Sequence, residues 1–334
     1  MEIQKILSRR IYADRQSYDL VYEWEDQLAE QFGAKLAFNP GFEITDSTKP
    51  VLKTLFNCVD TLCRPFVTNK LALTFEMNPA FRRSRSINKS NVIPWVIDFY
   101  INDSKGLSTF YKRFDKHPLV LVSSKEVYDF LIEKQCPLNI SHLALSISDK
   151  LRVTPTTKFE KQYDVVMMGR QNPILLDFLN KYKEKKNVSV VSCKKEKGHF
   201  NYYTFDGVFV GNADSREDCL NLLRKSRIGF YSTQGLDGDS RSARVHGFSQ
   251  VTPRFLEYLA TGNHVIARYA DNSDVDYYKM NTICPNTQTY DDFEAQMDKA
   301  LSEPVDMKLY SDYLENHYLS ARIKQLKEIK IGLL

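Results

Sequence analysis

The residues best suited to chemistry are concentrated in one stretch of the second half of the chain, HGFSQVTPRFLEYLATGNHVIARY (246–269). Thr252-Pro253 predicts the start of a helix, because Thr is a good N-cap and Pro fits the first helical position. The unpaired N–H groups of a helix start suit an anion such as a diphosphate. Arg254 in the first turn requires a nearby negative charge, which a diphosphate would supply. Glu257, one turn further on, is placed to accept hydrogen bonds from ribose hydroxyls.

Basic side chains on neighbouring segments would contribute to the same anion site. Arg241, Arg244 and His246 lie on the loop that leads into this helix. Arg170 follows the short apolar run YDVVMMG (163–169), which predicts a strand. Guanidinium groups bind phosphate through paired hydrogen bonds, so these arginines are candidate phosphate ligands.

Two carboxylates end apolar strands in the first half of the chain. Glu76 lies near the end of LALTFEM (71–77), and Asp98 lies in VIPWVIDFY (92–100). A carboxylate at the end of a strand can serve as a general base, so both are candidate catalytic residues.

A polar loop between these strands is rich in arginine. FRRSRSINK (81–89) contains Arg82, Arg83 and Arg85, which would clamp an anionic acceptor, such as a lipid diphosphate carrier at a membrane surface. A solvated loop and a nucleic-acid contact are the alternatives. The DxD patterns at 237–239 and 274–276 do not follow the strand pattern of a metal-dependent nucleotide site, so no metal site is expected.

Apolar runs alternate with segments of helical periodicity along the whole chain, which predicts an α/β fold with parallel sheets. The polar segment 151–162 has no periodicity and is interpreted as a linker. We therefore expect two facing Rossmann-like, doubly wound domains with a cleft between them, where ligands would lie at the carboxyl ends of the strands. The expected domains are 1–150, 151–312 and a closing helix over 313–334.

Composition limits the possible classes of protein. The 334 residues include 46 Lys or Arg and 42 Asp or Glu, a net charge of +4, which argues against a dedicated nucleic-acid binder. The six cysteines form no CxxC pair, which disfavours a zinc site. The N-terminus lacks the apolar core of a signal peptide, and no apolar run is long enough to span a membrane. We expect a cytoplasmic protein with free thiols, either free in the cytoplasm or peripheral at the inner face of the membrane.

The segment EYLATGNHVI (257–266) resembles the EYLA-x-G-x-P-V-V segment of GT-B glycosyltransferases, in particular the group 1 (family 4-like) enzymes. HGFSQ (246–250) is similar to their EGFG loop, with His246 in the place of Glu. Their earlier Glu corresponds to position 249, which is Ser here. DVVMMGR (164–170) resembles the start of their C-terminal domain, and 313–329 resembles the helix that crosses back over their first domain.

This resemblance implies a glycosyltransferase that binds a nucleotide diphosphate-sugar on the second domain and a saccharide or lipid-linked acceptor on the first. It assigns the ribose contact to Glu257 and a phosphate contact to Arg170, and makes His246 a candidate contact to the sugar. The helix start and the arginines would stabilise the leaving diphosphate, so neither a metal nor another cofactor is expected. The implied setting is capsule, O-antigen or other surface polysaccharide synthesis. The resemblance suggests that the anomeric configuration of the sugar is retained. An inverting enzyme would instead use Asp98 or Glu76 to deprotonate the acceptor hydroxyl.

Two alternatives remain open. One is a two-domain nucleotide-sugar epimerase, which would act on the donor without an acceptor. The other is a non-catalytic binder of an anionic polymer or nucleic acid through the loop 81–89, with an affinity that falls steeply with salt. A dehydrogenase with a dinucleotide cofactor is disfavoured, because no GxGxxG motif follows a predicted strand.

Overall fold

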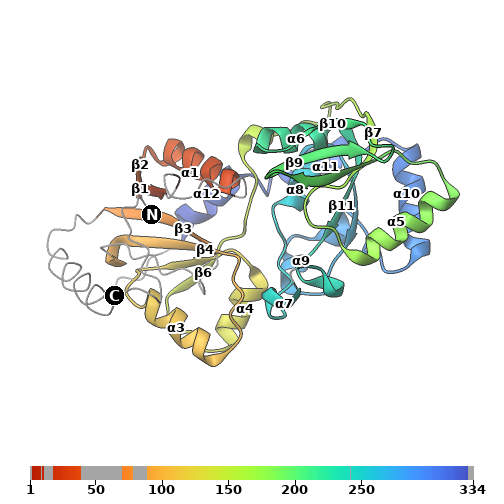
Figure 1. The fold of residues 1–334 in the computed structure, drawn as a ribbon. Coiled ribbons are helices and arrows are strands. Elements are labelled where there is room, and N and C mark those ends of the chain that lie inside the picture. The colour runs from red at the N-terminus through yellow and green to blue at the C-terminus, as the bar shows by residue number, and fades with distance from the viewer. Residues whose placement is uncertain are drawn as a thin grey trace. The chain divides into compact units, whose positions relative to one another are not determined.

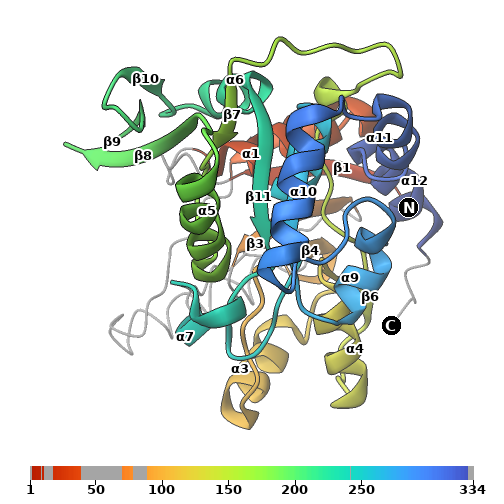
Figure 2. The same cartoon turned by 90° about the vertical axis from the view of Figure 1, so that its right-hand side faces the viewer.

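The structure is a computed structural model, shown in Figures 1 and 2, that describes residues 2–8, 10, 18–38, 70–77, 89–240 and 242–329. The chain divides into two compact units. Met1–Ala144 and Arg322–Leu334 form the first unit, and Leu145–Ala321 form the second. The N-terminal stretch of the first unit thus ends at Ala144, whereas the sequence analysis places this boundary at residue 150.

The first unit is built on a parallel sheet with the strand order β2-β1-β3-β4-β5-β6. Helix α1 lies on one face of this sheet, and α3 and α4 lie on the other (Figure 1). The strands are β1 (Ile3–Ser8), β2 (Lys35–Phe38), β3 (Leu71–Met77), β4 (Val92–Ile97), β5 (Val120–Val122) and β6 (Ile140–His142). The helices are α1 (Asp19–Phe32), α3 (Ser104–Phe114), α4 (Lys125–Glu133) and a 3-10 turn, η3 (Lys89–Asn91).

Aromatic packing holds helix α1 on the first sheet. Trp95 of β4 is buried and donates its indole N–H to the carbonyl of Leu143 at 2.9 Å. Its ring stacks on Phe75 and on Trp24 of α1, with centroids 5.1 and 6.4 Å apart. Each such aromatic side chain removes a large apolar area from water, so this cluster fixes the helix against the strands.

The second unit has a sheet with the order β10-β9-β8-β7-β11-β12. Helices α5 and α10 cover one face, and α6, α8 and α11 lie on the other (Figures 1 and 2). The strands are β7 (Tyr163–Val166), β8 (Val190–Glu196), β9 (His199–Thr204), β10 (Phe209–Asn212), β11 (Ser226–Ser232) and β12 (His264–Arg268). The helices are α5 (Pro173–Lys185), α6 (Arg216–Lys225), α7 (Ser242–Val245), α8 (Arg254–Ala260), α9 (Ser273–Tyr277), α10 (Tyr290–Ser302) and α11 (Met307–Leu314), with 3-10 turns η4 (Asp149–Leu151), η5 (Leu236–Gly238) and η6 (Met280–Thr282). A last helix, α12 (Leu319–Glu328), belongs in part to each unit.

The parallel strands expected in both halves are confirmed, but the second sheet is not parallel throughout. β8, β9 and β10 pair antiparallel, and Glu196 faces His199 across a two-residue turn. The turn residues Lys197 and Gly198 have φ of 51° and 94°, as a tight hairpin with a mirror-image turn requires. A Lys-Gly pair is a weaker hairpin signal than Asn-Gly, and the sequence analysis did not separate these strands.

Within the range 313–334 expected for a closing helix, the structure describes α12 (Leu319–Glu328) and the last two residues of α11. α11 and α12 are separated by a turn in which Tyr318 is fixed by two contacts. Its hydroxyl accepts the N–H of Val153 at 3.0 Å, and its backbone forms a parallel bridge with Ile147. α12 begins in the second unit and continues in the first, because the units divide between Ala321 and Arg322.

Among the residues that the structure describes, no helix combines the length and the apolar character needed to cross a membrane. The described cysteines are free thiols: Cys136, Cys193, Cys219 and Cys284.

Candidate functional site

The strand order of the second sheet reverses at β7, which lies between β8 and β11. In doubly wound sheets, ligands bind outside the carboxyl ends of the strands at such a point. Arg170 follows β7 at this end. Its Nε lies 2.7 Å from a carboxylate oxygen of Asp239, and its Nη2 donates to the carbonyl of Ser232 at 3.0 Å. The Arg170 guanidinium therefore ties the segment after β7 to the segment after β11.

A buried ion-pair cluster lies where α8 meets the start of α6. Glu257 has 2% of its surface exposed. Arg216 Nη1 donates to Glu257 Oε1 at 2.5 Å, and Arg254 Nη1 lies 3.0 Å from Oε2. Burial by itself raises the pKa of Glu257, but the charges of Arg254 and Arg216 outweigh it, so the pKa lies below its usual value. The carboxylate is ionised at neutral pH and holds two guanidinium groups together.

The start of α8 differs from the expectation in two respects. The capping residue is Pro253, and no side chain caps the helix. The Thr252 N–H is already paired, since it donates to the Tyr231 hydroxyl at 2.9 Å. The negative partner expected for Arg254 is Glu257 itself, so a bound diphosphate is not needed to explain an arginine in this turn.

Two tyrosines of the second sheet lie within the electrostatic influence of Arg170 and Arg254. Burial raises the pKa of Tyr231 to about 12, and hydrogen bonds from Thr252 and the charge of Arg170 oppose that rise. The Tyr202 hydroxyl lies 2.8 Å from the sulfur of Met168, just before Arg170. Burial also raises the Tyr202 pKa, and the charge of Arg254 opposes it. The charge of Arg170 thus acts on the Tyr231 phenol, and the charge of Arg254 acts on the Tyr202 phenol.

The carboxylates of the two DxD patterns have structural partners. Arg268 binds Asp237 through Nε at 2.5 Å and Nη2 at 3.1 Å, which lowers the pKa of Asp237. Asp239 is the partner of Arg170, and Asp274 accepts the N–H of Val251 at 3.0 Å. Within the described ranges, no three His, Cys, Asp or Glu side chains gather as metal ligands would.

The candidate bases of the first unit differ in their surroundings. Glu76 is buried in β3 and pairs with Arg113 at 2.7 Å. Asp98 directly follows β4 and adopts a φ of 57°, a left-handed conformation that is strained for a residue with a side chain. Such strain at the carboxyl end of a strand is common at functional sites, so Asp98 remains the stronger prediction for a general base.

The remaining candidates lie on loops. Arg244 is exposed in α7, and His246 directly follows that helix, exposed and with a φ of 50°. The predictions for Arg241 and for the loop 81–89 fall outside the described residues: Arg82, Arg83, Arg85 and Arg241.

The sequence analysis missed Arg216, the second partner of Glu257. The local signal at this position is only a helix start, since Ser215 and Asp218 form a capping box. Ser249, at the position where the sequence resemblance aligns an earlier Glu of group 1 glycosyltransferases, is buried, and its hydroxyl lies 2.8 Å from Thr233 Oγ1.

A cavity of about 550 Å³ lies elsewhere in the second unit. Lys161, Arg227 and His264 line it, and none of the residues selected from the sequence does. These three residues lie at the amino ends of strands, at the opposite edge of the sheet from Arg170.

No protein-family model matches the sequence, and no curated protein matches it. Solved structures match over nearly the whole chain. A trehalose-6-phosphate synthase is 8% identical, with 99% of this chain and 100% of that chain covered and a TM-score of 0.57. Sucrose-phosphate synthase from Thermosynechococcus elongatus is 11% identical, with 98% of each chain covered and a TM-score of 0.55. The UDP-forming α,α-trehalose-phosphate synthase from Burkholderia xenovorans is 9% identical, with 98% of each chain covered and a TM-score of 0.54.

The chain has the GT-B fold. At identities of 8–11% this likeness shows the fold and does not assign a role to any residue.

Proposed function

We propose that the protein is a glycosyltransferase that moves a sugar from a nucleotide diphosphate-sugar to a saccharide or lipid-linked saccharide. The observation that supports it best is the set of guanidinium groups at the carboxyl edge of the second sheet, in a chain with the GT-B fold. Arg170, Arg216 and Arg254 are held there by Asp239 and Glu257. Arginines fixed in this way are preorganised for a diphosphate.

The carboxylate of Glu257 has two roles in this proposal. It orients both arginines in the free protein. Arg254 is the more exposed partner, with 31% of its side chain accessible against 11% for Arg216. A donor diphosphate draws Arg254 away from Glu257, and the freed carboxylate oxygen then accepts a ribose hydroxyl.

The guanidinium groups stabilise the negative charge that develops on the leaving diphosphate as the bond to the sugar breaks. Such preorganised positive charge lowers the barrier in a site that excludes water. Because the arginines supply this charge, we propose that the transfer does not require a metal ion.

The acceptor is assigned to the first unit. Asp98 has no hydrogen-bond or ion-pair partner among the described residues and serves as the base in an inverting transfer, whereas Glu76 is occupied by Arg113. Arg82, Arg83 and Arg85 would bind an anionic acceptor, and His246 would contact the transferred sugar. A lipid-linked acceptor would bring the protein to the inner face of the membrane, in surface polysaccharide synthesis.

Calorimetric titration with a panel of nucleoside diphosphates tests the donor site. UDP comes first, because a synthase with a similar fold is UDP-forming. We expect one nucleotide to bind the wild type, and Arg170→Gln and Arg254→Gln to weaken it about tenfold or more, since each removes a charge-assisted hydrogen bond. Arg224→Gln is the control, because Arg224 lies on α6 but pairs with the exposed Glu217.

Failure of every nucleoside diphosphate to bind at millimolar concentration contradicts the proposal. Equal affinity in Arg254→Gln, Arg170→Gln and wild type places the nucleotide elsewhere and also contradicts it. Incubation of the nucleotide-sugar without an acceptor then separates transfer from epimerisation, because only an epimerase converts the donor alone into its isomer.

A further inference from the structure

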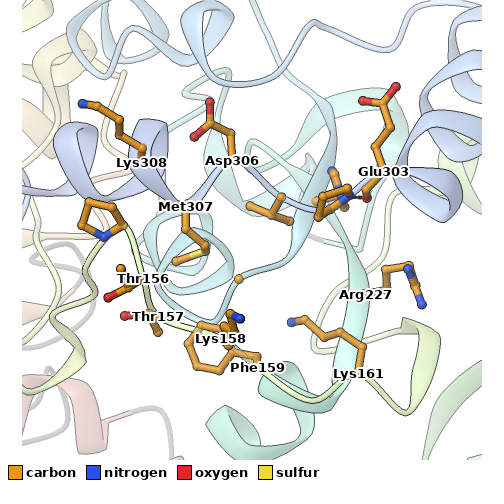
Figure 3. A pocket seen from close by; sticks show the side chains of 15 residues that line it. Thr156, Thr157, Lys158, Phe159, Lys161, Arg227, Glu303, Asp306, Met307 and Lys308 are labelled. Carbon is orange, nitrogen blue, oxygen red and sulfur yellow. Dashed lines mark hydrogen bonds between the residues drawn. The ribbon is translucent and has the colours of Figure 1, made fainter.

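The cavity of about 550 Å³ lies at the amino ends of three neighbouring strands of the second sheet (Figure 3). Lys161 lies just before β7, Arg227 is the second residue of β11, and His264 is the first residue of β12. The volume falls within the range of pockets that hold small organic ligands. Its floor includes Gly262, whose φ of 66° and close contact with the ring of Phe159 leave no room for a side chain.

The Lys161 ammonium lacks a negative partner in this cavity. It is partly buried and donates to the carbonyl of Thr261 at 2.9 Å. An ammonium group has three donors, and among the described residues no carboxylate lies within ion-pair distance of it. Arg227 lines the same cavity, with its own carboxylate contact, Asp164, at 3.8 Å.

The pKa values of Lys161 and His264 are both lowered, as expected for partly buried basic groups where positive charge exceeds negative charge. Burial, and to a smaller extent the nearby charge of Arg227, lower the pKa of Lys161 to about 7. Burial also lowers the pKa of His264, and the charges of Lys161 and Arg227 contribute. The charge of Arg227 therefore disfavours protonation of both Lys161 and His264.

The two acids of the cavity do not neutralise Lys161. The carboxylate of Glu303 points away from Lys161 in Figure 3 and lies 3.9 Å from Lys299. Asp306 caps α11 by accepting the N–H of Leu309 at 2.9 Å. Both carboxylates thus have other interactions.

We infer that this cavity is a second ligand site, which binds a phosphate group between Lys161 and Arg227 and is separate from the proposed donor site. A phosphate offers acceptors for the remaining N–H groups of Lys161 and for the planar fork of Arg227. Phe159 and Met307 line the same cavity and contact the organic part of a phosphate ester. The ligand is inorganic phosphate or a small phosphate monoester.

The NMR resonance of the Met307 methyl group reports on this cavity, because Met307 lines it. Phosphate bound at the proposed donor site is not expected to shift this resonance. The protein is labelled with ¹³C at its methionine methyls, and the Met307 resonance is assigned with Met307→Leu. Glycerol 3-phosphate, inorganic phosphate and glycerol are titrated separately at constant ionic strength and pH. We expect a saturable shift of the Met307 resonance with a phosphate compound and none with glycerol.

Lys161→Gln removes the charge but keeps an N–H donor for the Thr261 carbonyl. We expect it to weaken phosphate binding about tenfold or more, because a charge-assisted hydrogen bond is lost. Arg227→Gln is a second variant with the same expectation. Lys308→Gln is the control: Lys308 also lines the cavity, but it is exposed and paired with Asp312 at 2.6 Å.

Tighter binding of glycerol 3-phosphate than of inorganic phosphate identifies an organic ester as the ligand class, and equal binding identifies the phosphate alone. The inference is overturned if the Met307 resonance does not move with either phosphate. It is also overturned if Lys161→Gln and Arg227→Gln bind phosphate as tightly as the wild type.

Discussion

The two ends of the parallel strands in the second unit carry basic side chains in different electrostatic settings. At the carboxyl end, Arg170 and Arg254 each lie within 3.0 Å of a carboxylate oxygen. At the amino end, Lys161 donates to a backbone carbonyl and lies beside the positive charge of Arg227. At the carboxyl end, carboxylates of the chain itself neutralise both arginines, whereas at the amino end Lys161 has no carboxylate partner among the described residues.

This difference determines how each end responds to substitution. A guanidinium matched to a buried carboxylate contributes to folding, so removing either partner leaves an uncompensated buried charge. A partly buried ammonium without a carboxylate opposes folding until an anion binds. Removing a charge from the ion pairs at the carboxyl end is therefore expected to destabilise the protein, whereas removing the charge of Lys161 at the amino end is expected to stabilise it.

The largest expected effect comes from Glu257→Gln. It removes the negative charge that Arg216 and Arg254 share, and breaking a buried ion pair typically destabilises a protein by about 3–5 kcal/mol. Urea unfolding at pH 7 measures the change in the free energy of unfolding. Glu217→Gln is the control, because its pair with Arg224 is exposed and is worth about 1 kcal/mol or less.

The same variant has a pH signature. Because the pKa of Glu257 is lowered in the folded state, its stabilisation is present above the unfolded pKa of about 4.3 and is lost as the pH falls through the folded pKa. The difference between wild type and Glu257→Gln should shrink in acid. A difference that is constant with pH would show that Glu257 acts through packing and not through charge.

Gly229→Ala tests the packing beneath the carboxyl end. A Cβ at this position in β11 would lie 2.3 Å from the ring of Tyr258, which is fully buried on α8 next to Glu257. Overpacking of this kind costs about 1–3 kcal/mol. Thermal unfolding measures the loss, and unchanged stability would mean that α8 moves freely away from β11.

At the amino end, the charge of Lys161 is expected to lower the stability of the folded protein, which is the opposite of the effect expected for Glu257. The folded pKa of Lys161, about 7, lies below its unfolded value, so the unfolded chain binds more protons between these values. The wild type should gain stability as the pH rises above 7, by up to about 1.4 kcal/mol per pH unit relative to Lys161→Gln. Parallel pH profiles of the two proteins would contradict an uncompensated charge.

The smallest effect concerns the helix that carries Arg216. Ser215→Ala removes the hydroxyl that accepts the Asp218 N–H at 3.1 Å and should cost about 1 kcal/mol. Because Arg216 is the next residue, nucleotide affinity should fall in addition to stability. Lower stability with unchanged affinity would separate Arg216 from the donor site.

Local patterns explain what could be predicted from the sequence. Apolar runs and helical periodicity predicted the alternation of strands and helices. The donor contacts predicted for Arg254 and Glu257 stay predictions, and the structure shows these two side chains paired with each other. The Thr252 cap was wrong, because the capping residue of α8 is Pro253 and no side chain caps the helix.

The features that were missed depend on contacts between distant segments. Arg216 and Glu257 are 41 residues apart, and no local pattern connects them. Lys161 becomes unusual only because the fold places it beside Arg227 and His264 at the amino ends of three strands. The burial of Lys161, and the lack of a carboxylate beside it among the described residues, follow from that arrangement, which the sequence alone does not display.

The most direct test of the proposed donor site is a crystal structure of the protein with the nucleoside diphosphate that the calorimetric panel selects. We predict a diphosphate bound at the carboxyl ends of β7 and β11, within hydrogen-bond distance of Arg170 or Arg254. A nucleotide bound only in the cavity lined by Lys161 and Arg227 would contradict the assignment of the donor site.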